Sequence, residues 1–144
     1  MRTIMNMLAE DLINYARYPI ATQGPKREAI LTDVQESLEE QGCAVLQEFL
    51  SPNGVAASVA ETEKVADNGH RSYSRTNAYF TTDDPSLPQD DPRRQFFDRS
   101  NAFIPADNFA AGGALRTVHN SPGFDQFVRE CLGCLLYTSP SPRD

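Results

Sequence analysis

The stretch of the sequence most able to do chemistry is a run of alternating polar and aromatic residues at positions 72–80. Tyrosine, threonine and phenylalanine recur in it, which predicts a β-strand. Side chains alternate between the two faces of a strand, so four of these residues are expected to share one face: Tyr73, Arg75, Asn77 and Tyr79. We predict that Arg75 and Asn77 contact a substrate, because a guanidinium can hold a carboxylate through two hydrogen bonds and an amide can orient it. The alternatives are an ion pair of Arg75 with a nearby aspartate and simple packing of the two tyrosines, each with a tethered hydroxyl.

Other polar residues do not have the spacing of a metal or phosphate site. His70 and His119 lack carboxylate or histidine partners at ligand spacing, so surface or capping roles are expected for them. The aspartate pairs at 83–84 and 90–91 are each followed by proline and do not match a calcium loop, which indicates solvated loop charges. The glycine pair at 112–113 lacks the pattern of a phosphate-binding loop. We therefore predict no metal ligand in this chain.

The cysteines include one C-x-x-C pair, Cys131 and Cys134, a spacing found in redox pairs and zinc sites. A second such pair is absent from the sequence. Residues 134–144 resemble the translation of a transposase sequencing adapter, so we expect them to be a foreign tail and 1–133 to be the native part of a longer reading frame. The odd number of cysteines, with Cys43 as the third, favours reduced thiols.

Length and charge narrow the class of protein. A chain of 144 residues is long enough for one domain with a modest core. Its net charge of -7 disfavours nucleic acid and anionic membranes as partners. The sequence has no apolar run long enough to cross a bilayer, and Glu10 and Asp11 stand where a signal peptide would be apolar. These features predict a cytoplasmic protein.

The apolar spacing predicts helices that alternate with short strands. One helix should begin at Pro25 and end at Gly42, because proline is favoured at the first helical position and glycine just past the last. Serine-proline pairs at 51–52 and 121–122 are typical of helix N-caps. Further helices are expected at 3–16, from 52 to about 68, at 109–118 and after 122, with a short one at 93–97.

The strands are expected at 43–46, 72–80 and 100–104, separated by an irregular loop at 83–92. The first is predicted to be buried, because it is a short apolar run directly after a helix-ending glycine. Helices and strands in this order predict an α+β chain.

The helix, the Gly-Cys-Ala-Val-Leu-Gln-Glu-Phe-Leu segment at 42–50 and the serine-proline-capped helix are similar to the N-terminal lead-in of iron(II)/2-oxoglutarate-dependent oxygenases. Later blocks resemble the branch of that family containing free-amino-acid halogenases and hydroxylases. These blocks are Arg-Tyr-Pro-Ile at 17–20, His-Arg-Ser-Tyr-Ser-Arg-Thr-Asn-Ala-Tyr-Phe at 70–80, Asp-Asp-Pro-Ser-Leu-Pro at 83–88 and Pro-Gly-Phe at 122–124.

The resemblance implies support helices followed by a few strands of an incomplete double-stranded β-helix, or jelly roll. It implies a parent enzyme that uses Fe(II) and 2-oxoglutarate to oxidise a C–H bond of a small polar substrate such as a free amino acid. The parent would hold iron through a His-x-Asp or His-x-Gly and a distal histidine. Neither His70 nor His119 begins such a motif, so the resemblance puts the iron ligands beyond residue 133 and predicts that the fragment is inactive. The alternative is a small acidic α+β interaction module without catalysis.

Overall fold

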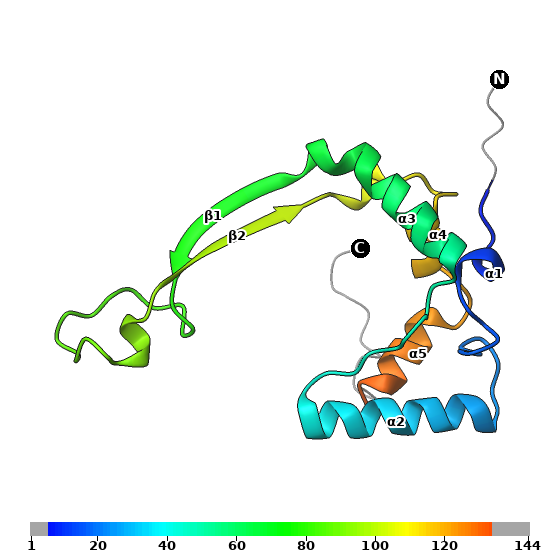
Figure 1. Ribbon diagram of the computed structural model, residues 1–144, viewed down its shortest axis with the longest axis horizontal. Helices are drawn as coiled ribbons and strands as arrows, with labels where there is room; N and C mark the ends of the chain where they lie inside the picture. The colour runs from blue at the N-terminus through cyan, green and yellow to red at the C-terminus, as the bar shows by residue number, and fades with distance from the viewer. Residues whose placement is uncertain (1–5, 134–144) are drawn as a thin grey trace, which may run out of the picture. The chain divides into compact units, whose positions relative to one another are not determined.

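The structure is a computed structural model, and it describes residues 6–133 (Figure 1). The chain forms two compact units. Unit 1 contains the residues up to 63 and those from 109 onward, and unit 2 contains residues 64–108. Unit 1 is helical and unit 2 is built on a pair of strands, so the predicted α+β class is confirmed. The expectation of a foreign tail at 134–144, including Cys134 of the C-x-x-C pair, lies outside the described residues.

The long helix of unit 1, α2, follows the predicted boundaries. It spans Pro25–Gln41, with proline in its first turn. Gly42 adopts the left-handed conformation (φ 72°), and its N–H donates to the Leu38 carbonyl at 3.0 Å. The helix buries Arg27, Leu31 and Val34 on one side.

The first helix, α1, is much shorter than predicted. It covers Ala9–Leu12, a single turn, where the apolar spacing predicted a helix over 3–16. The chain leaves the helical conformation at Ile13, which is buried and forms an isolated antiparallel bridge with Leu50. A long-range backbone pairing therefore replaces the continuation of the helix.

The predicted buried strand at 43–46 is wrong. Within residues 6–133 these residues have no strand partner, and Cys43 and Val45 are exposed. Only Ala44 and Leu46 pack against the core of unit 1. None of the four residues is buried, because no strand within residues 6–133 pairs with this segment and alternate side chains face solvent.

The third helix, α3, spans Pro52–Val65 and continues into a 3-10 turn at Ala66–Asn68, close to the prediction. The predicted cap is confirmed, since the Ser51 hydroxyl accepts a hydrogen bond from the Gly54 N–H at 3.0 Å. Gly54 lies against the backbone of α1, where an added Cβ would stand 2.2 Å from the Leu12 carbonyl oxygen. The close approach of these two segments therefore requires glycine.

The last helices, α4 (Ala114–His119) and α5 (Phe124–Cys131), correct two predictions. The helix expected over 109–118 begins only after Gly113, since glycine costs conformational entropy inside a helix. Ser121 does not cap α5. Its hydroxyl donates instead to the Val118 carbonyl at 2.7 Å, and Gly123 (φ 79°) is the residue before the helix.

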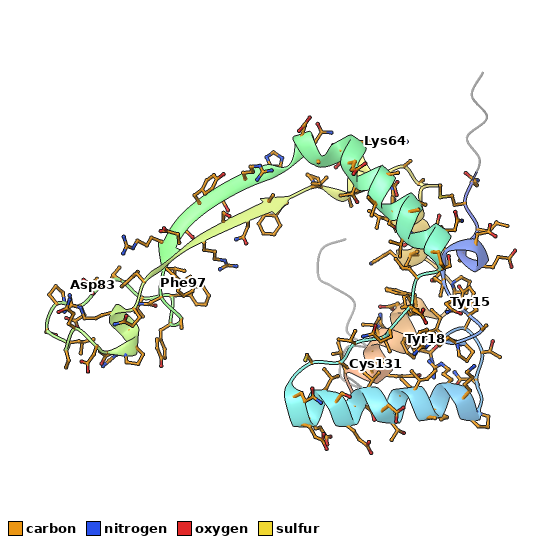
Figure 2. The ribbon with its side chains drawn as sticks, viewed as in Figure 1. Tyr15, Tyr18, Lys64, Asp83, Phe97 and Cys131 are labelled. Carbon is orange, nitrogen blue, oxygen red and sulfur yellow. The ribbon has the colours of Figure 1, made fainter. Side chains whose placement is uncertain are left out.

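The core of unit 1 joins segments distant in sequence. It comprises Ile13, Tyr18, Ile20, Leu31, Val34, Phe127 and Cys131. Figure 2 shows side chains of the N-terminal segment, α2 and α5 converging in this region, with Tyr18 and Cys131 labelled. A hydrophobic cluster of this kind is the main source of stability for a small unit.

A charged side chain lies in the same core. Arg27 is 1% exposed, and its Nη1 pairs with the Glu130 carboxylate at 2.5 Å. Its Nε donates to the Ile20 carbonyl at 3.2 Å, and the guanidinium lies 5.7 Å from the centre of the Phe127 ring. Because a buried charge is costly without partners, these contacts tie α2 to α5.

Unit 2 is an antiparallel ribbon of two strands, β1 (His70–Thr76) and β2 (Phe97–Phe103). The predicted strand over 72–80 ends at Thr76, and the one predicted over 100–104 begins three residues earlier, at Phe97. The segment between them is irregular, as predicted, apart from a 3-10 turn at Pro92–Arg94 where a short helix was expected. The ribbon is the only sheet in the described part of the chain. None of the helices found in residues 6–133 is long and apolar enough to cross a membrane.

The Arg27–Glu130 pair predicts a pH-dependent effect of Glu130→Gln. Hydrogen bonding from Gln126, then from Arg27, holds the pKa of Glu130 below its usual value near 4.5. The carboxylate therefore stabilises the fold above that value, and this contribution is lost as pH falls through the lower, folded-state pKa. We expect Glu130→Gln to lower the free energy of unfolding by roughly 1–3 kcal/mol at neutral pH, with the difference shrinking in acid. Urea unfolding at several pH values measures it.

The matched control is Asp125→Asn, which removes a carboxylate from the same helix. Asp125 pairs with Arg129 on the surface at 2.6 Å, so its loss should change the unfolding free energy by less than about 0.5 kcal/mol. Equal effects of the two substitutions at neutral pH would contradict the proposed role of Arg27.

Candidate functional site

The candidate site is one face of the ribbon in unit 2. Strand residues alternate between faces, and directly opposite residues share a face. The register pairs Tyr73 with Ser100 and Arg75 with Asp98, so these four side chains share a face with Arg71. Sequence reasoning placed Tyr73 and Arg75 together, and this part of the prediction is confirmed.

Arg75 is exposed at the end of this face. Asp98 stands directly opposite it, but no ion pair of Arg75 occurs among residues 6–133, where the alternative prediction expected one. Together with Tyr73 and Ser100, these two residues line a shallow depression of about 490 Å³, which Ser74 and Arg99 of the opposite face also border. The guanidinium is thus accessible to an anionic ligand.

Tyr73 and Tyr79 do not pack as predicted. Tyr73 is 76% exposed and Tyr79 is 58% exposed. Neither tyrosine hydroxyl has a hydrogen-bond partner within the described residues. Tyr73 therefore presents an uncovered aromatic ring between the side chains of Arg71 and Arg75. An aromatic ring flanked by guanidinium groups is a favourable surface for a small ligand with an apolar part and a carboxylate.

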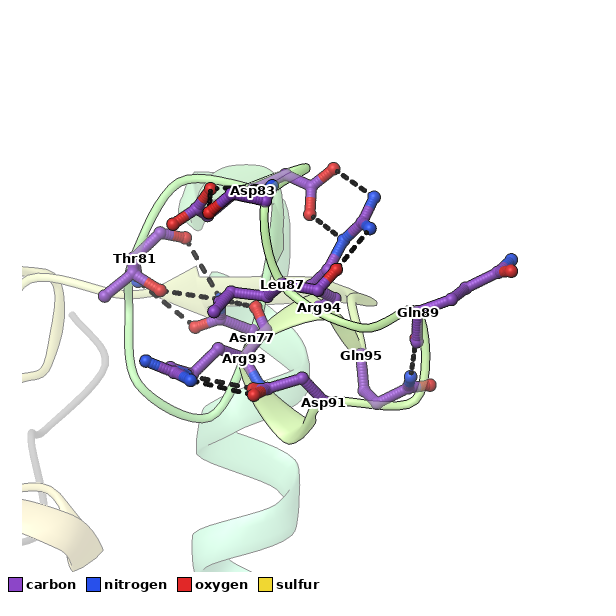
Figure 3. A network of polar contacts seen from close by, with 11 residues as sticks. Asn77, Thr81, Asp83, Leu87, Gln89, Asp91, Arg93, Arg94 and Gln95 are labelled. Atoms are coloured by element: carbon purple, nitrogen blue, oxygen red, sulfur yellow. Dashed lines mark hydrogen bonds and ion pairs between the residues drawn. The ribbon is translucent and has the colours of Figure 1, made fainter.

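Asn77 does not lie on this face, which corrects the predicted grouping. It follows the last residue of β1 and is fully buried. Its Nδ2 donates to the Thr81 hydroxyl at 2.9 Å and to the carbonyls of Thr81 (3.2 Å) and Arg93 (2.5 Å). Its Oδ1 accepts from the Thr81 N–H at 3.1 Å (Figure 3) and from the Tyr79 N–H at 3.0 Å. The amide is thus occupied within the loop, and in this structure it orders the 77–95 segment.

The same loop contains an ion-pair network that sequence reasoning missed. Arg94 makes two contacts with the Asp83 carboxylate, at 2.8 and 3.2 Å, and Arg93 makes two with Asp91, at 2.9 and 2.8 Å (Figure 3). The side-chain and backbone hydrogen bonds from Arg93 lower the pKa of Asp91 to about 2. Two of the four loop aspartates are therefore bound to arginine, where solvated charges were predicted.

Two sequence signals could have indicated that aspartates of this loop are hydrogen-bonded and not simply solvated. Asp91 precedes Pro92 and accepts a hydrogen bond from the Arg93 N–H, the arrangement of an acidic N-cap with proline at the first helical position. Asp84 likewise accepts from the N–H and hydroxyl of Ser86, as aspartate does in a turn. These hydrogen bonds also lower the pKa of Asp84.

His119, Cys43 and Cys131 belong to unit 1, and His70 lies on the face of the ribbon opposite that of Arg75. His119 is exposed, with Nδ1 3.1 Å from the Asn120 Oδ1 and its ring 6.0 Å from that of Phe124, and His70 is exposed at the start of β1. Burial raises the pKa of the Cys131 thiol. Within residues 6–133, no three His, Cys, Asp or Glu side chains converge in a way that could hold a metal ion.

Comparison with known proteins adds no assignment. No family model matches the chain, and neither a curated protein nor a solved structure matches it.

The burial of Asn77 predicts how the loop responds to substitution. Asn77→Ala removes the acceptor of the Tyr79 and Thr81 amides, so their hydrogen exchange should accelerate roughly 10- to 100-fold. Asn77→Asp keeps this acceptor but places an oxygen beside the Arg93 carbonyl, so it should also destabilise the loop. Exchange monitored by NMR measures both effects.

Ser86→Ala is the matched control. It removes an exposed hydrogen bond to Asp84 in the same loop but does not touch the Asn77 contacts. The Tyr79 and Thr81 amides should keep their protection in this variant. Unchanged protection in Asn77→Ala would show that the amide of Asn77 does not order the loop.

Proposed function

We propose that this chain is the N-terminal part of a non-haem iron(II)/2-oxoglutarate-dependent oxygenase and that its ribbon binds the carboxylate of a small polar substrate. The proposal starts from the resemblance of the 42–50 and 70–80 segments to the amino-acid halogenase and hydroxylase branch of that family. In a parent enzyme the ribbon would be part of the jelly roll. Unit 1 would supply support helices.

The observation that carries the substrate part of this proposal is the position of Arg75. Its guanidinium is exposed, unpaired within the described chain and adjacent to an exposed tyrosine ring. Guanidinium groups bind carboxylates through two parallel hydrogen bonds, which fixes the orientation of the ligand as well as its position. Asp98, directly opposite on β2, is suited to the ammonium group of the same ligand, because a free amino acid carries both charges.

Asn77 has a supporting part in this proposal. The loop that it orders begins at the end of the strand bearing Arg75, two residues away. Its amide would hold the loop next to Arg75 in place without contacting the substrate. A direct contact with substrate would require the hydrogen bonds of Asn77 to Thr81 and Arg93 to break.

The cofactors do not fit the residues described here. Iron in such enzymes is held by two histidines and a carboxylate, and no such group converges within residues 6–133. Fe(II) and 2-oxoglutarate would supply the oxidising chemistry of the parent, with ligands from elsewhere in a longer protein. The residues described here would contribute substrate binding to that enzyme.

The alternative is a small acidic interaction module without catalysis. The exposure of large aromatic side chains on unit 2 favours it, since such side chains often mark contacts with other proteins. Tyr73, Phe80, Phe97 and Phe103 are all more than half exposed. In this reading Arg75 would contact an acidic group of a protein partner.

Sequencing the source DNA past the codon for Gly133 separates the two proposals. The oxygenase proposal expects the frame to continue into a His-x-Asp or His-x-Gly followed by a distal histidine. A frame without such a motif would refute it and leave the interaction module.

In the longer protein, Arg75→Ala tests the carboxylate site. We expect the KM for an amino-acid substrate to rise roughly 10- to 100-fold, because a charged hydrogen-bonded pair is lost. The readout is substrate-dependent consumption of 2-oxoglutarate, measured with an amino acid and with its carboxamide. Arg75→Ala should abolish the preference for the carboxylate.

Arg71→Ala is the matched control. Arg71 is an exposed arginine on the same strand and the same face, on the other side of Tyr73. Its removal changes the net charge equally but leaves the depression next to Asp98 intact. Equal changes in KM for both variants would mean that Arg75 acts only through general electrostatics.

A further inference from the structure

The outer edge of β2 is an unoccupied pairing surface in the described structure. β2 hydrogen-bonds to β1 on one side, and no strand within residues 6–133 lies on its other side (Figure 1). Every other N–H and C=O of an edge strand points away from its neighbour and can pair with another chain. A two-stranded ribbon is marginally stable alone, so additional pairing would stabilise it.

One face of β2 carries two exposed aromatic side chains. Phe97 and Phe103, the first and last residues of the strand, are 52% and 64% exposed. They lie on the same face as Arg99 and Asn101, since they are separated by even numbers of residues. Phe97 stands opposite Thr76 and Phe103 opposite His70, so β1 offers neither an apolar partner.

We propose that β2 pairs with β2 of a second copy of this chain, antiparallel and centred on Ser100. In this register Phe97 of each chain stands opposite Phe103 of the other, Asp98 opposite Ala102, and Arg99 opposite Asn101. The register uses all seven residues of the strand. It forms two cross-strand aromatic pairs and sets no like charges against each other. The product is a closed, two-fold dimer with a continuous four-stranded sheet.

The hydrogen-bonding pattern is compatible with this register. Residues opposite each other have positions that sum to 200, so both members of every pair are odd or both are even. The groups that point outward from β2 are on alternate residues and therefore meet the outward groups of its copy. A shift by one residue would break this match, and a shift by two would keep it but set Phe97 opposite Asn101 or Phe103 opposite Arg99.

The edge of β1 is a poorer self-pairing surface. Its sequence is symmetric about Tyr73, and full-length antiparallel pairing with a copy would set Arg71 opposite Arg75 twice. Like charges directly opposite each other are destabilising. The β1 edge therefore stays free for further strands of the proposed parent enzyme. The dimer uses only the β2 edge, so it does not depend on the oxygenase proposal.

Pairing of β1 with β2 of another copy is the remaining arrangement. It would repeat the register within the chain and set Arg75 opposite Asp98, but it leaves each phenylalanine against Thr76 or His70. It also exposes a new edge after each addition, which produces open-ended assemblies. The aromatic pairs and the closure favour the β2–β2 dimer.

Analytical ultracentrifugation of the full chain over a range of concentrations tests the proposal, with two substitutions at Asn101 that differ in sign. Asn101→Asp sets an acid opposite Arg99 twice and should tighten the dimer, while Asn101→Arg sets like charges opposite and should weaken it. Each change in Kd is expected to lie between about 2-fold and 30-fold. Ser72→Asp and Ser72→Arg are the controls, because Ser72 faces Asn101 from β1 and lies one strand further from the interface.

Disulfide cross-linking gives a second, independent measurement. Ser100→Cys places a thiol on the two-fold axis, opposite its own copy, so oxidation should link two chains through that position. Ser72→Cys, on β1, should not. Peptide mapping by mass spectrometry separates this link from any formed by the exposed Cys43.

A dimer whose Kd responds in opposite directions to the two Asn101 substitutions, with the position-100 disulfide, supports the proposal. A monomer at every concentration overturns it, as do assemblies larger than a dimer or a dimer indifferent to the sign of the charge at position 101.

Discussion

The burial of Arg27 is the constraint on which unit 1 depends. Its guanidinium lies among apolar side chains, so every contact that it makes must offset the loss of water. The Ile20 carbonyl comes from the N-terminal segment and the Glu130 carboxylate from α5, while Arg27 itself belongs to α2. One charged group therefore sets where three segments of the sequence meet. A leucine at this position could pack equally well but would not specify its neighbours.

In unit 2 the buried side chain of Asn77 has the role that Arg27 has in unit 1. The ribbon has no apolar core of its own, since almost every residue of its strands is exposed. The order of the unit comes instead from polar contacts, those of the Asn77 amide and the arginine–aspartate pairs of Arg93 and Arg94. A buried and fully bonded amide specifies one backbone arrangement, because any other leaves its donors without partners.

The proposed functions use the surfaces that these two constraints leave open. Ordering the loop through Asn77 keeps the end of β1 in place without covering it, so Arg75 remains accessible. The face with Arg75 is charged and suits a small ligand, whereas the outer edge of β2, with Phe97 and Phe103 at the ends of the strand, suits a second protein chain. The two proposals therefore concern different surfaces of one ribbon and do not compete.

Local sequence determined the elements whose ends are set by their own residues. The limits of α2 follow from Pro25 and Gly42, and the start of α3 follows from the Ser51 hydroxyl, because caps act within one turn of the chain. The two strands and the loop between them were also predictable from β-forming residues and prolines. The alternation of side chains along a strand likewise predicted that Tyr73 and Arg75 share one face. Only tertiary structure decided the rest. Asn77 does not share that face because its amide bonds Tyr79 and Thr81 in the turn after the strand and also the distant Arg93 carbonyl. The α1 helix ends early because Ile13 pairs with Leu50, far along the chain. Periodicity in a sequence indicates which side of a helix or strand is apolar. It does not indicate which distant backbone group will hydrogen-bond to that helix or strand.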